Sequence, residues 1–232
     1  DLAGELRHAR HSLQGRTEHG YDATGRIEAT RRVPRAASGA AANEERFAYD
    51  PAGNLLDSAM AGARGPGYVR DNLVRVFEDK RYDYDGHGRL VRKRAGRHTE
   101  QRFEWDEEHR LLAVRTTRRP GTPQAVTQHT RFDYDALGRR VARHDAFGST
   151  LFVWEGLRLL EERRGGHATS YVYEPGSHVP LARLDAGQDT AGREAGELRY
   201  FHTAPSGLPE ELSDSEGRLC WRASYRTWGA TV

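Results

Sequence analysis

Carboxylates recur beside aromatic residues along this chain, and paired carboxylates are the groups that acid–base chemistry uses. The stretch YDYDGHGRLVRKR, residues 82–94, holds two tyrosine–aspartate pairs, and adjacent glutamates stand at 161–162 and 210–211. Glycoside hydrolysis needs two carboxyl groups about 5–10 Å apart. Neighbours on a strand point to opposite faces, so neither glutamate pair forms an acid–base couple by itself. A β fold can still bring distant carboxylates together, and that alternative stays open.

The histidines, one serine and the single cysteine are the other candidates for chemistry. The eleven histidines are scattered, without the converging ligands that zinc needs. Ser206 lacks the glycine two residues earlier that a nucleophile elbow requires, and DYDGHG at 83–88 lacks two ligands of a calcium loop. Cys220 is expected to be a buried structural thiol in a strand, and a sole cysteine forms no intramolecular disulfide. We therefore expect a segment that is not an enzyme, with no catalytic residue, metal or cofactor.

The tyrosine–aspartate pairs belong to a repeat. Each copy runs aromatic, acid, two or three turn residues usually including glycine, then arginine or asparagine, then aliphatic residues. Good copies begin at Tyr21 (YDATGRI), Tyr49 (YDPAGNLL), Tyr84 (YDGHGRLV) and Tyr134 (YDALGRRV), and diluted copies begin at Trp105, Trp154 and Tyr173. A recurring unit of this length indicates a repeated supersecondary element.

The physical chemistry of one copy identifies that element as a hairpin. In FAYDPAGNLL, Phe47 and Tyr49 alternate with strand period, Asp50 suits the first position of a turn, and Gly53 supplies the left-handed residue of a type I turn with a G1 bulge. The aromatic residue is expected to pack, and the acid and glycine to shape the turn. The predicted anchors are Tyr21, Asp22 and Gly25; Tyr49, Asp50 and Gly53; Tyr84, Asp85 and Gly88; and Tyr134, Asp135 and Gly138.

The predicted fold is all-β, with consecutive antiparallel hairpins in one curved, twisted strip. Repeat stacking is expected to bury a continuous core. Residues 70–81 are predicted to be strand rather than helix. Long loops are predicted at 33–45, 57–67, 116–128 and 185–197, which are rich in Ala, Gly, Pro and Thr.

The charge and hydropathy of the chain exclude two classes of partner. The net charge is +2 from 36 basic and 34 acidic residues, without the concentrated basic face of a nucleic-acid binder. No apolar run approaches a membrane span or a signal peptide. The first residue is not methionine, so we expect an excised part of a longer chain.

Residues 199–229, RYFHTAPSGLPEELSDSEGRLCWRASYRTWG, together with the four good copies, resemble the core segment and YD repeats of the Rhs (rearrangement hotspot) proteins and teneurin-type YD shells. The residues in register with that core segment include His202, Gly207, Pro209, Asp214, Gly217, Trp221, Tyr225, Trp228 and Gly229. Ala204-Pro205-Ser206 departs from the usual acidic start, and the closing Asp-Pro-x-Gly motif does not follow. The resemblance implies one segment over 1–232: a partial leading repeat at 1–20, YD repeats with long loops at 21–198, and the core-type segment at 199–232.

The resemblance also implies a function. Rhs shells are β-strips that spiral into a cocoon around a C-terminal toxin domain, so this segment is expected to be a non-catalytic part of a polymorphic toxin shell. Such a shell is delivered by a secretion system, which is type VI secretion for many of these effectors. The implied partners are the rest of the shell and the toxin, a secretion spike, a chaperone, and further copies through exposed strand edges. The protein would be made in the bacterial cytoplasm and secreted as part of an effector. The alternative is a carbohydrate-binding β-repeat module at a cell surface, which a ridge of exposed Tyr and Trp would favour.

Overall fold

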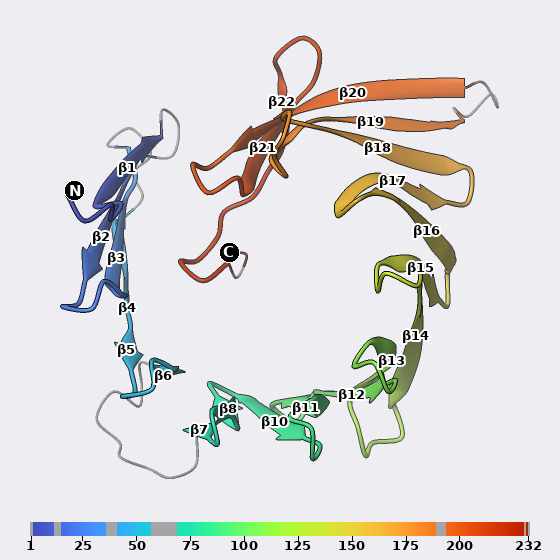
Figure 1. Ribbon diagram of the computed structural model, residues 1–232, viewed down its shortest axis with the longest axis horizontal. Helices are drawn as coiled ribbons and strands as arrows, with labels where there is room; N and C mark the ends of the chain where they lie inside the picture. The colour runs from blue at the N-terminus through green and yellow to red at the C-terminus, as the bar shows by residue number, and fades with distance from the viewer. Residues whose placement is uncertain are drawn as a thin grey trace. The chain divides into compact units, whose positions relative to one another are not determined.

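The structure is a computed structural model that describes residues 2–11, 15–35, 41–56, 69–188, 194–229 and 231. All regular structure within these residues is β-strand (Figure 1), which confirms the all-β prediction. The chain forms two compact units, Asp1–Tyr82 and Asp83–Val232. None of the described residues forms a helix that could cross a membrane.

The first unit contains one four-stranded antiparallel sheet and short two-stranded ladders. The sheet has the order β1 (His8–His11), β2 (Gly15–Tyr21), β3 (Ile27–Val33) and β4 (Asn43–Arg46). The ladders pair β5 (Ala48–Tyr49) with β6 (Leu55–Leu56), and β7 (Val69–Arg70) with β8 (Leu73–Val74). Strand is therefore confirmed for 70–81, although turns with left-handed residues at Asp71, Asn72 and Glu78 divide it into short pieces.

One fourteen-stranded sheet runs in chain order from β9 to β22, and every strand pairs antiparallel with its sequence neighbours. Its strands are β9 (Val76–Phe77), β10 (Lys80–Tyr84), β11 (Leu90–Ala95), β12 (Thr99–Trp105), β13 (Leu111–Arg118), β14 (Val126–Tyr134), β15 (Arg140–Asp145), β16 (Gly148–Glu155), β17 (Arg158–Arg164), β18 (His167–Tyr173), β19 (Pro180–Gln188), β20 (Glu194–Thr203), β21 (Pro209–Ser213) and β22 (Leu219–Arg222). Within the second unit the strand direction turns progressively from β11 to β22 (Figure 1). The predicted twisted, curved strip of hairpins is confirmed.

Consecutive antiparallel strands reverse direction, so the connections between them alternate between the two sides of the sheet where the strands end. In the names given below, an edge is one of these two rows of strand ends. The turns after β10, β12, β14, β16, β18 and β20 share one edge, here called the YD edge. The connections after β11, β13, β15, β17, β19 and β21 share the other, the far edge. The copies at Tyr84, Trp105, Tyr134, Trp154 and Tyr173 all turn at the YD edge.

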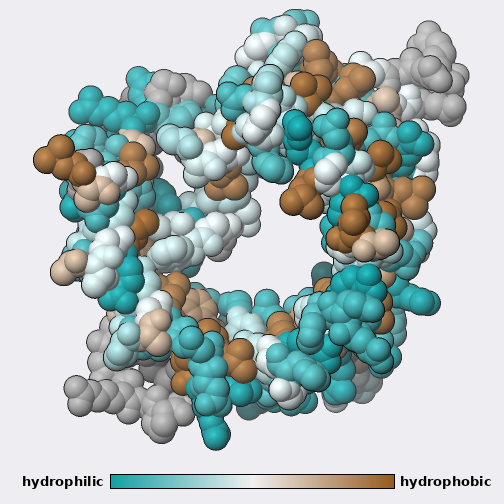
Figure 2. Space-filling model, viewed as in Figure 1, coloured by the Kyte–Doolittle hydropathy of each residue, from teal (hydrophilic) through white to brown (hydrophobic). Residues whose placement is uncertain are grey.

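The prediction of a continuous core is wrong for the described residues. The buried apolar side chains among them are Ala142, Phe152, Ala182 and Leu212. Many large apolar residues are exposed instead, such as Leu151, Val172 and Leu184, and hydrophobic residues stand among hydrophilic ones over the visible surface (Figure 2). Each sheet is a single layer here, and a single layer buries side chains only against their neighbours on the same face.

The predicted loop at 116–128 is also too long, because β13 continues to Arg118 and β14 begins at Val126. Thr117 and Thr127 lie opposite each other, with their hydroxyl oxygens 3.0 Å apart. Polar β-branched residues suit strands whose faces are both exposed. β19 and β20 similarly enter the loop predicted at 185–197, and β4 begins inside the one at 33–45. The loop predicted at 57–67 lies outside the described residues.

Candidate functional site

Each YD turn is built around the carboxylate of its aspartate. In the turn after β14, Asp135 Oδ1 accepts the backbone N–H groups of Leu137 and Arg139, each at 2.9 Å. The backbone N–H of Gly138 donates to the Asp135 carbonyl at 3.0 Å, and Gly138 has a φ of 77°. This is a type I turn closed by a left-handed residue.

Five other turns share this geometry, whereas the diluted copies at Trp154 and Tyr173 carry a glutamate in place of the aspartate. The backbone N–H four residues after the aspartate donates to its Oδ1 at Asp22, Asp50, Asp85, Asp106 and Asp214. Positive φ values occur at Gly25, Gly53, Gly88, Gly207, Gly217 and Gly229. His109 stands at the glycine position of the Trp105 copy with a φ of 62°.

The arginine that closes each turn has a role that sequence reasoning missed. Its Nε donates to Oδ2 of the turn aspartate at 2.6–2.8 Å, and in one copy an asparagine amide replaces it at 2.9 Å. The donors are Arg26, Arg89, Arg110, Arg139, Arg218 and Asn54. The repeat shows a recurring Arg or Asn at this position, but the sequence does not indicate which group that side chain contacts.

These contacts keep the turn aspartates ionised. The backbone N–H of Arg26 and the hydroxyl of Thr24 hold the pKa of Asp22 well below its usual range. At Asp85, burial acts to raise the pKa, but the backbone N–H and then the guanidinium of Arg89 outweigh it and lower the pKa to about 2. A carboxylate this acidic and this fully bonded is unsuited to proton transfer near neutral pH.

The aromatic residue of six copies reaches back to the preceding turn. Its side-chain O–H or N–H donates to the backbone carbonyl that follows that turn, at 2.7–2.9 Å. The pairs are Tyr21 with Leu6, Tyr49 with Ile27, Trp105 with Leu90, Tyr134 with Leu111, Trp154 with Arg140 and Tyr173 with Leu159. These aromatic residues are hydrogen-bonded to a neighbouring hairpin as well as packed.

Arginines complete the connection between successive turns. Arg110 lies over the ring of Tyr134, with its Cζ 5.9 Å from the ring centroid. In the first unit the corresponding distance from Arg26 to Tyr49 is 4.7 Å. Arg89 Nη1 donates to the carbonyl of Asp106 at 2.8 Å. Within each unit, successive turns are therefore in contact, and we call this row of contacts the YD ladder.

The core-type segment uses the same turn at the far edge. Asp214, Gly217 and Arg218 form a YD-type turn between β21 and β22. His202 Nε2 lies 2.8 Å from the hydroxyl oxygen of Ser213 on the neighbouring strand. Near the end of the described chain, the Gly229 N–H donates to the Arg226 carbonyl at 2.9 Å, one residue after Trp228.

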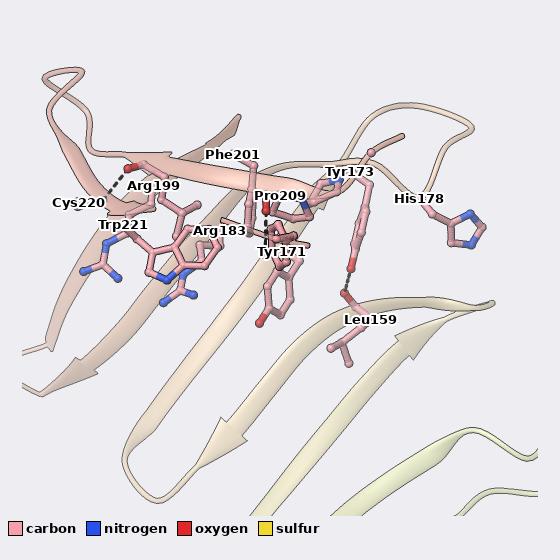
Figure 3. Close-up of a pocket in the computed structure, with 14 residues that line it drawn as sticks. Leu159, Tyr171, Tyr173, His178, Arg183, Arg199, Phe201, Pro209, Cys220 and Trp221 are labelled. Atoms are coloured by element: carbon pink, nitrogen blue, oxygen red, sulfur yellow. Dashed lines mark hydrogen bonds between the residues drawn. The ribbon is translucent and has the colours of Figure 1, made fainter. Parts of the chain in front are cut away.

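A pocket of about 760 Å³ lies on one face of the sheet from β17 to β22 and the segment that follows (Figure 3). The aromatic and arginine side chains that line it are Tyr171, Tyr173, Arg183, Arg199, Phe201, Trp221 and Tyr225. Among the residues predicted from sequence, Gly207, Pro209, Trp221 and Tyr225 are brought together here, and the four Tyr-Asp-Gly anchor sets are not.

Cys220 also lines this aromatic pocket, and the prediction that its thiol is buried is wrong. Cys220 is exposed on the terminal strand β22, where Sγ donates to the carbonyl of Leu212 at 3.3 Å. No further strand is paired with β22 among the described residues to cover it.

The adjacent glutamates do not form acid–base couples. Glu162 accepts the Tyr171 hydroxyl at 2.8 Å, whereas Glu161, on the other face, bonds to Arg163 and Ser170. Glu211 is buried and paired with Arg222 Nε at 2.9 Å. In the part of the chain that the structure describes, no three His, Cys, Asp or Glu side chains are grouped to hold a metal ion.

Ser149, His144 and Asp133 form a polar row that sequence reasoning also missed. His144 Nδ1 lies 2.7 Å from Ser149 Oγ, and Nε2 lies 2.8 Å from Asp133 Oδ2. The three residue types are those of a hydrolytic triad. They stand on adjacent strands at an open sheet face, and neither the aromatic pocket nor a smaller one beside Asp185 includes them. The row is best explained as cross-strand hydrogen bonding.

The chain resembles bacterial toxins over nearly its whole length. The RHS protein family model matches residues 198–232. Double-stranded DNA deaminase toxin A of Burkholderia cenocepacia (strain H111) is 39% identical over 99% of this chain and 16% of its own length. Toxin protein Tse5 of Pseudomonas aeruginosa is 27% identical over 91% of this chain and 20% of its own. Probable deoxyribonuclease RhsB of Dickeya dadantii is 28% identical over 99% of this chain and 15% of its own length.

Among solved structures, the crystal structure of TcdB2-TccC3 matches with a TM-score of 0.49 and 12% identity. The match covers 93% of this chain and 10% of that one. The chain thus spans about a fifth or less of the toxins and of the solved structure that it resembles.

Proposed function

Because this chain belongs to the Rhs family, we propose that it is a non-catalytic structural segment of a β-shell that encloses a C-terminal toxin domain. The observation that carries the proposal is the unbroken antiparallel order from β9 to β22, with the YD ladder joining successive turns. A long single-layer sheet held together by local contacts is suited to be a wall. Residues 1–232 form one YD-repeat segment of it, ending in the core-type segment at 199–232.

The names of the relatives support a toxin as cargo, since three of them are called a toxin or a deoxyribonuclease. Most of each relative lies outside the region of similarity, which leaves room for the rest of a shell and a separate toxin domain. In this proposal those two are the main partners, with a secretion spike and a chaperone during delivery. The protein is made in the bacterial cytoplasm and leaves as an effector through type VI secretion.

The exposed aromatic residues favour a shell over the carbohydrate-binding alternative. Of the exposed aromatic residues, Trp221 and Tyr200, which are 41% and 42% exposed, lie on opposite faces of the sheet. Trp221 is in register with Leu212, and Leu212 is in register with Phe201, the sequence neighbour of Tyr200. The repeat aromatics have their polar atoms bonded to backbone carbonyls. Those polar atoms are therefore unavailable to the hydroxyl groups of a sugar.

The test uses the native gene product that contains this segment. Its intact mass is measured, it is treated with a nonspecific protease, and the remnant is imaged by electron microscopy; a sample unfolded before digestion is the control. We expect a resistant hollow particle that retains a C-terminal piece. A small open remnant whose C-terminal piece is digested as fast as in the control would refute the proposal, and a glycan-binding screen would follow.

A further inference from the structure

The aromatic pocket has a chemical character that the wall function does not explain. Tyr171, Arg183 and Arg199 are aligned across β18, β19 and β20, and Phe201, Leu212 and Trp221 are aligned across β20, β21 and β22. Arg199 and Phe201 are two residues apart on one strand, so both rows share one face. The pocket floor is therefore a continuous patch of rings and guanidinium groups.

The tyrosine hydroxyl groups of the pocket already donate hydrogen bonds to other groups of the protein. Tyr171 donates to Glu162 at 2.8 Å, Tyr173 to the Leu159 carbonyl at 2.8 Å, and Tyr225 to the Pro209 carbonyl at 3.0 Å. Burial and then the hydrogen bond to Glu162 raise the pKa of Tyr171, so its ring stays neutral. The phenol protons are unavailable to the hydroxyl groups of a sugar, and the ring faces remain for an apolar group.

Two uncommitted polar groups at one end of the pocket are donors. Arg183 contacts Asp185 through Nε at 2.9 Å and Nη2 at 2.8 Å, which leaves Nη1 without a partner among the described residues. Trp221 Nε1 also has no partner within the described part of the chain. Arg199 is bonded to both Asp185 and Glu197. Figure 3 shows Trp221 and the two arginines at one end of the pocket and His178 at the other.

We propose that the aromatic pocket binds an apolar peptide segment with a carboxylate at the Arg183 end, supplied by the enclosed toxin-bearing part of the same polypeptide. The inference rests on the proposed shell function. Apolar side chains fit the ring faces, and an Asp or Glu beside them accepts from Arg183 Nη1 and Trp221 Nε1. A volume of about 760 Å³ accommodates a few side chains.

A weak site is sufficient for this role. Tethering two groups in one polypeptide gives an effective concentration of order millimolar, so a contact of modest affinity is occupied most of the time. The same weakness lets the segment leave when the shell opens. The pocket would therefore fix where one part of the cargo lies against the wall without locking it there.

The experiment is photo-crosslinking in the full natural polypeptide, with p-benzoylphenylalanine replacing Phe201 and, as the matched control, replacing Tyr200 on the opposite face. We expect position 201 to crosslink to C-terminal peptides that hold an acidic residue beside apolar ones, at a yield about tenfold above position 200. Equal yields, no C-terminal crosslink, or capture of a glycan would overturn the proposal. Protease protection is measured on the same samples: a protected C-terminal piece with no crosslink leaves the shell function standing, whereas an unprotected one removes that function too.

A second pair of variants tests the carboxylate. Arg183→Met in the position 201 background keeps the aliphatic stem and leaves Asp185 bonded to Arg199. Arg163→Met is its control, because Arg163 is an exposed arginine on the opposite face. We expect the first change to lower the crosslink yield about tenfold and the second to leave it unchanged, with protease protection intact in both. An unchanged yield for Arg183→Met would show that no carboxylate is recognised.

Discussion

At the scale of single residues, the YD turn shows how a backbone conformation selects its side chains. Gly138 and His109 occupy the same turn position with φ values of 77° and 62°. The left-handed conformation costs an L-residue roughly 1–2 kcal/mol, and glycine is free of that cost. The turn therefore imposes the conformation, and most copies meet it with glycine.

Reciprocal substitutions at these two positions test this. His109→Gly is expected to raise the free energy of unfolding by about 1 kcal/mol, and Gly138→Ala to lower it by a similar amount. A Cβ at Gly138 would meet nothing within 4 Å, so the cost is that of the backbone alone. Denaturant unfolding measures both, with Gly86→Ala as control, since Gly86 has equal space and no positive φ. Equal effects at Gly86 and Gly138 would contradict the turn assignment.

The aromatic hydrogen bond gives a second prediction. Tyr134→Phe removes the donor to the Leu111 carbonyl and is expected to lower the free energy of unfolding by about 1 kcal/mol. Tyr200→Phe is the matched control, because Tyr200 is exposed and its hydroxyl has no partner among the described residues. If both variants unfold at the same denaturant concentration, the YD ladder contributes little through this bond.

The sequence predicts the turn better than it predicts the ladder. Asp135 and Gly138 act within five residues, and such local chemistry is visible in one copy of the repeat. The partner of Tyr134 is Leu111, 23 residues earlier, and it becomes a neighbour only after two strands have paired. The prediction that Cys220 is buried is wrong for a related reason. The flanking Leu and Trp indicate a strand, but they do not indicate whether a further strand covers it.

At the scale of the strands, bulges place the aromatic residue. The pairing register shifts directly before Trp105, Tyr134, Trp154 and Tyr173. A bulge bends its strand and increases the local twist. A shift repeated at these four turns therefore adds curvature in the same sense, and it aims each ring toward the preceding hairpin.

The two edges of the sheet should differ in their tolerance of insertions. Six Gly/Ser residues inserted after Gly121, in the far-edge connection between β13 and β14, are expected to cost less than about 1 kcal/mol, because lengthening a loop changes closure entropy slowly. The same insertion after Gly138 separates Asp135 from Arg139 and breaks the turn. The thermal unfolding midpoint should therefore be near-native for the insertion after Gly121 and clearly lowered for the insertion after Gly138. Equal midpoints would show that the turns of the YD edge contribute no more to stability than the connections of the far edge.

At the scale of the whole molecule, the ionised turn aspartates make stability depend on acid. Their pKa values are lower in the folded state than the roughly 3.9 of an unfolded chain, so the folded state binds protons less readily. Their contribution is fully present above about pH 4 and is lost as the pH falls through the folded pKa, about 2 for Asp85. The denaturant concentration at the unfolding midpoint, measured at pH 5, 4, 3 and 2, should decrease as the pH falls through that window. Asp85→Asn should be less stable at pH 7 and should lose less between pH 4 and 2; an identical loss would exclude Asp85 from the effect.

The single-layer sheet also predicts association. The strand β22 has one unpaired edge among the described residues, and both sheet faces carry exposed apolar residues. Unpaired edges and exposed apolar surface favour contacts between chains. Residues 1–232 as an isolated chain should therefore show a weight-average mass by light scattering that rises with concentration. A strict monomer at high concentration would contradict an open strip.

The YD ladder joins each turn only to the turns beside it, and this has a consequence for how such genes change. A duplication or deletion of one two-strand unit carries its aromatic residue, aspartate, glycine and arginine together, and the new neighbours find the same partners that the old ones had. Unequal recombination between repeats therefore yields a longer or shorter strip that still folds. This architecture therefore tolerates the gain or loss of whole two-strand units more readily than point substitution.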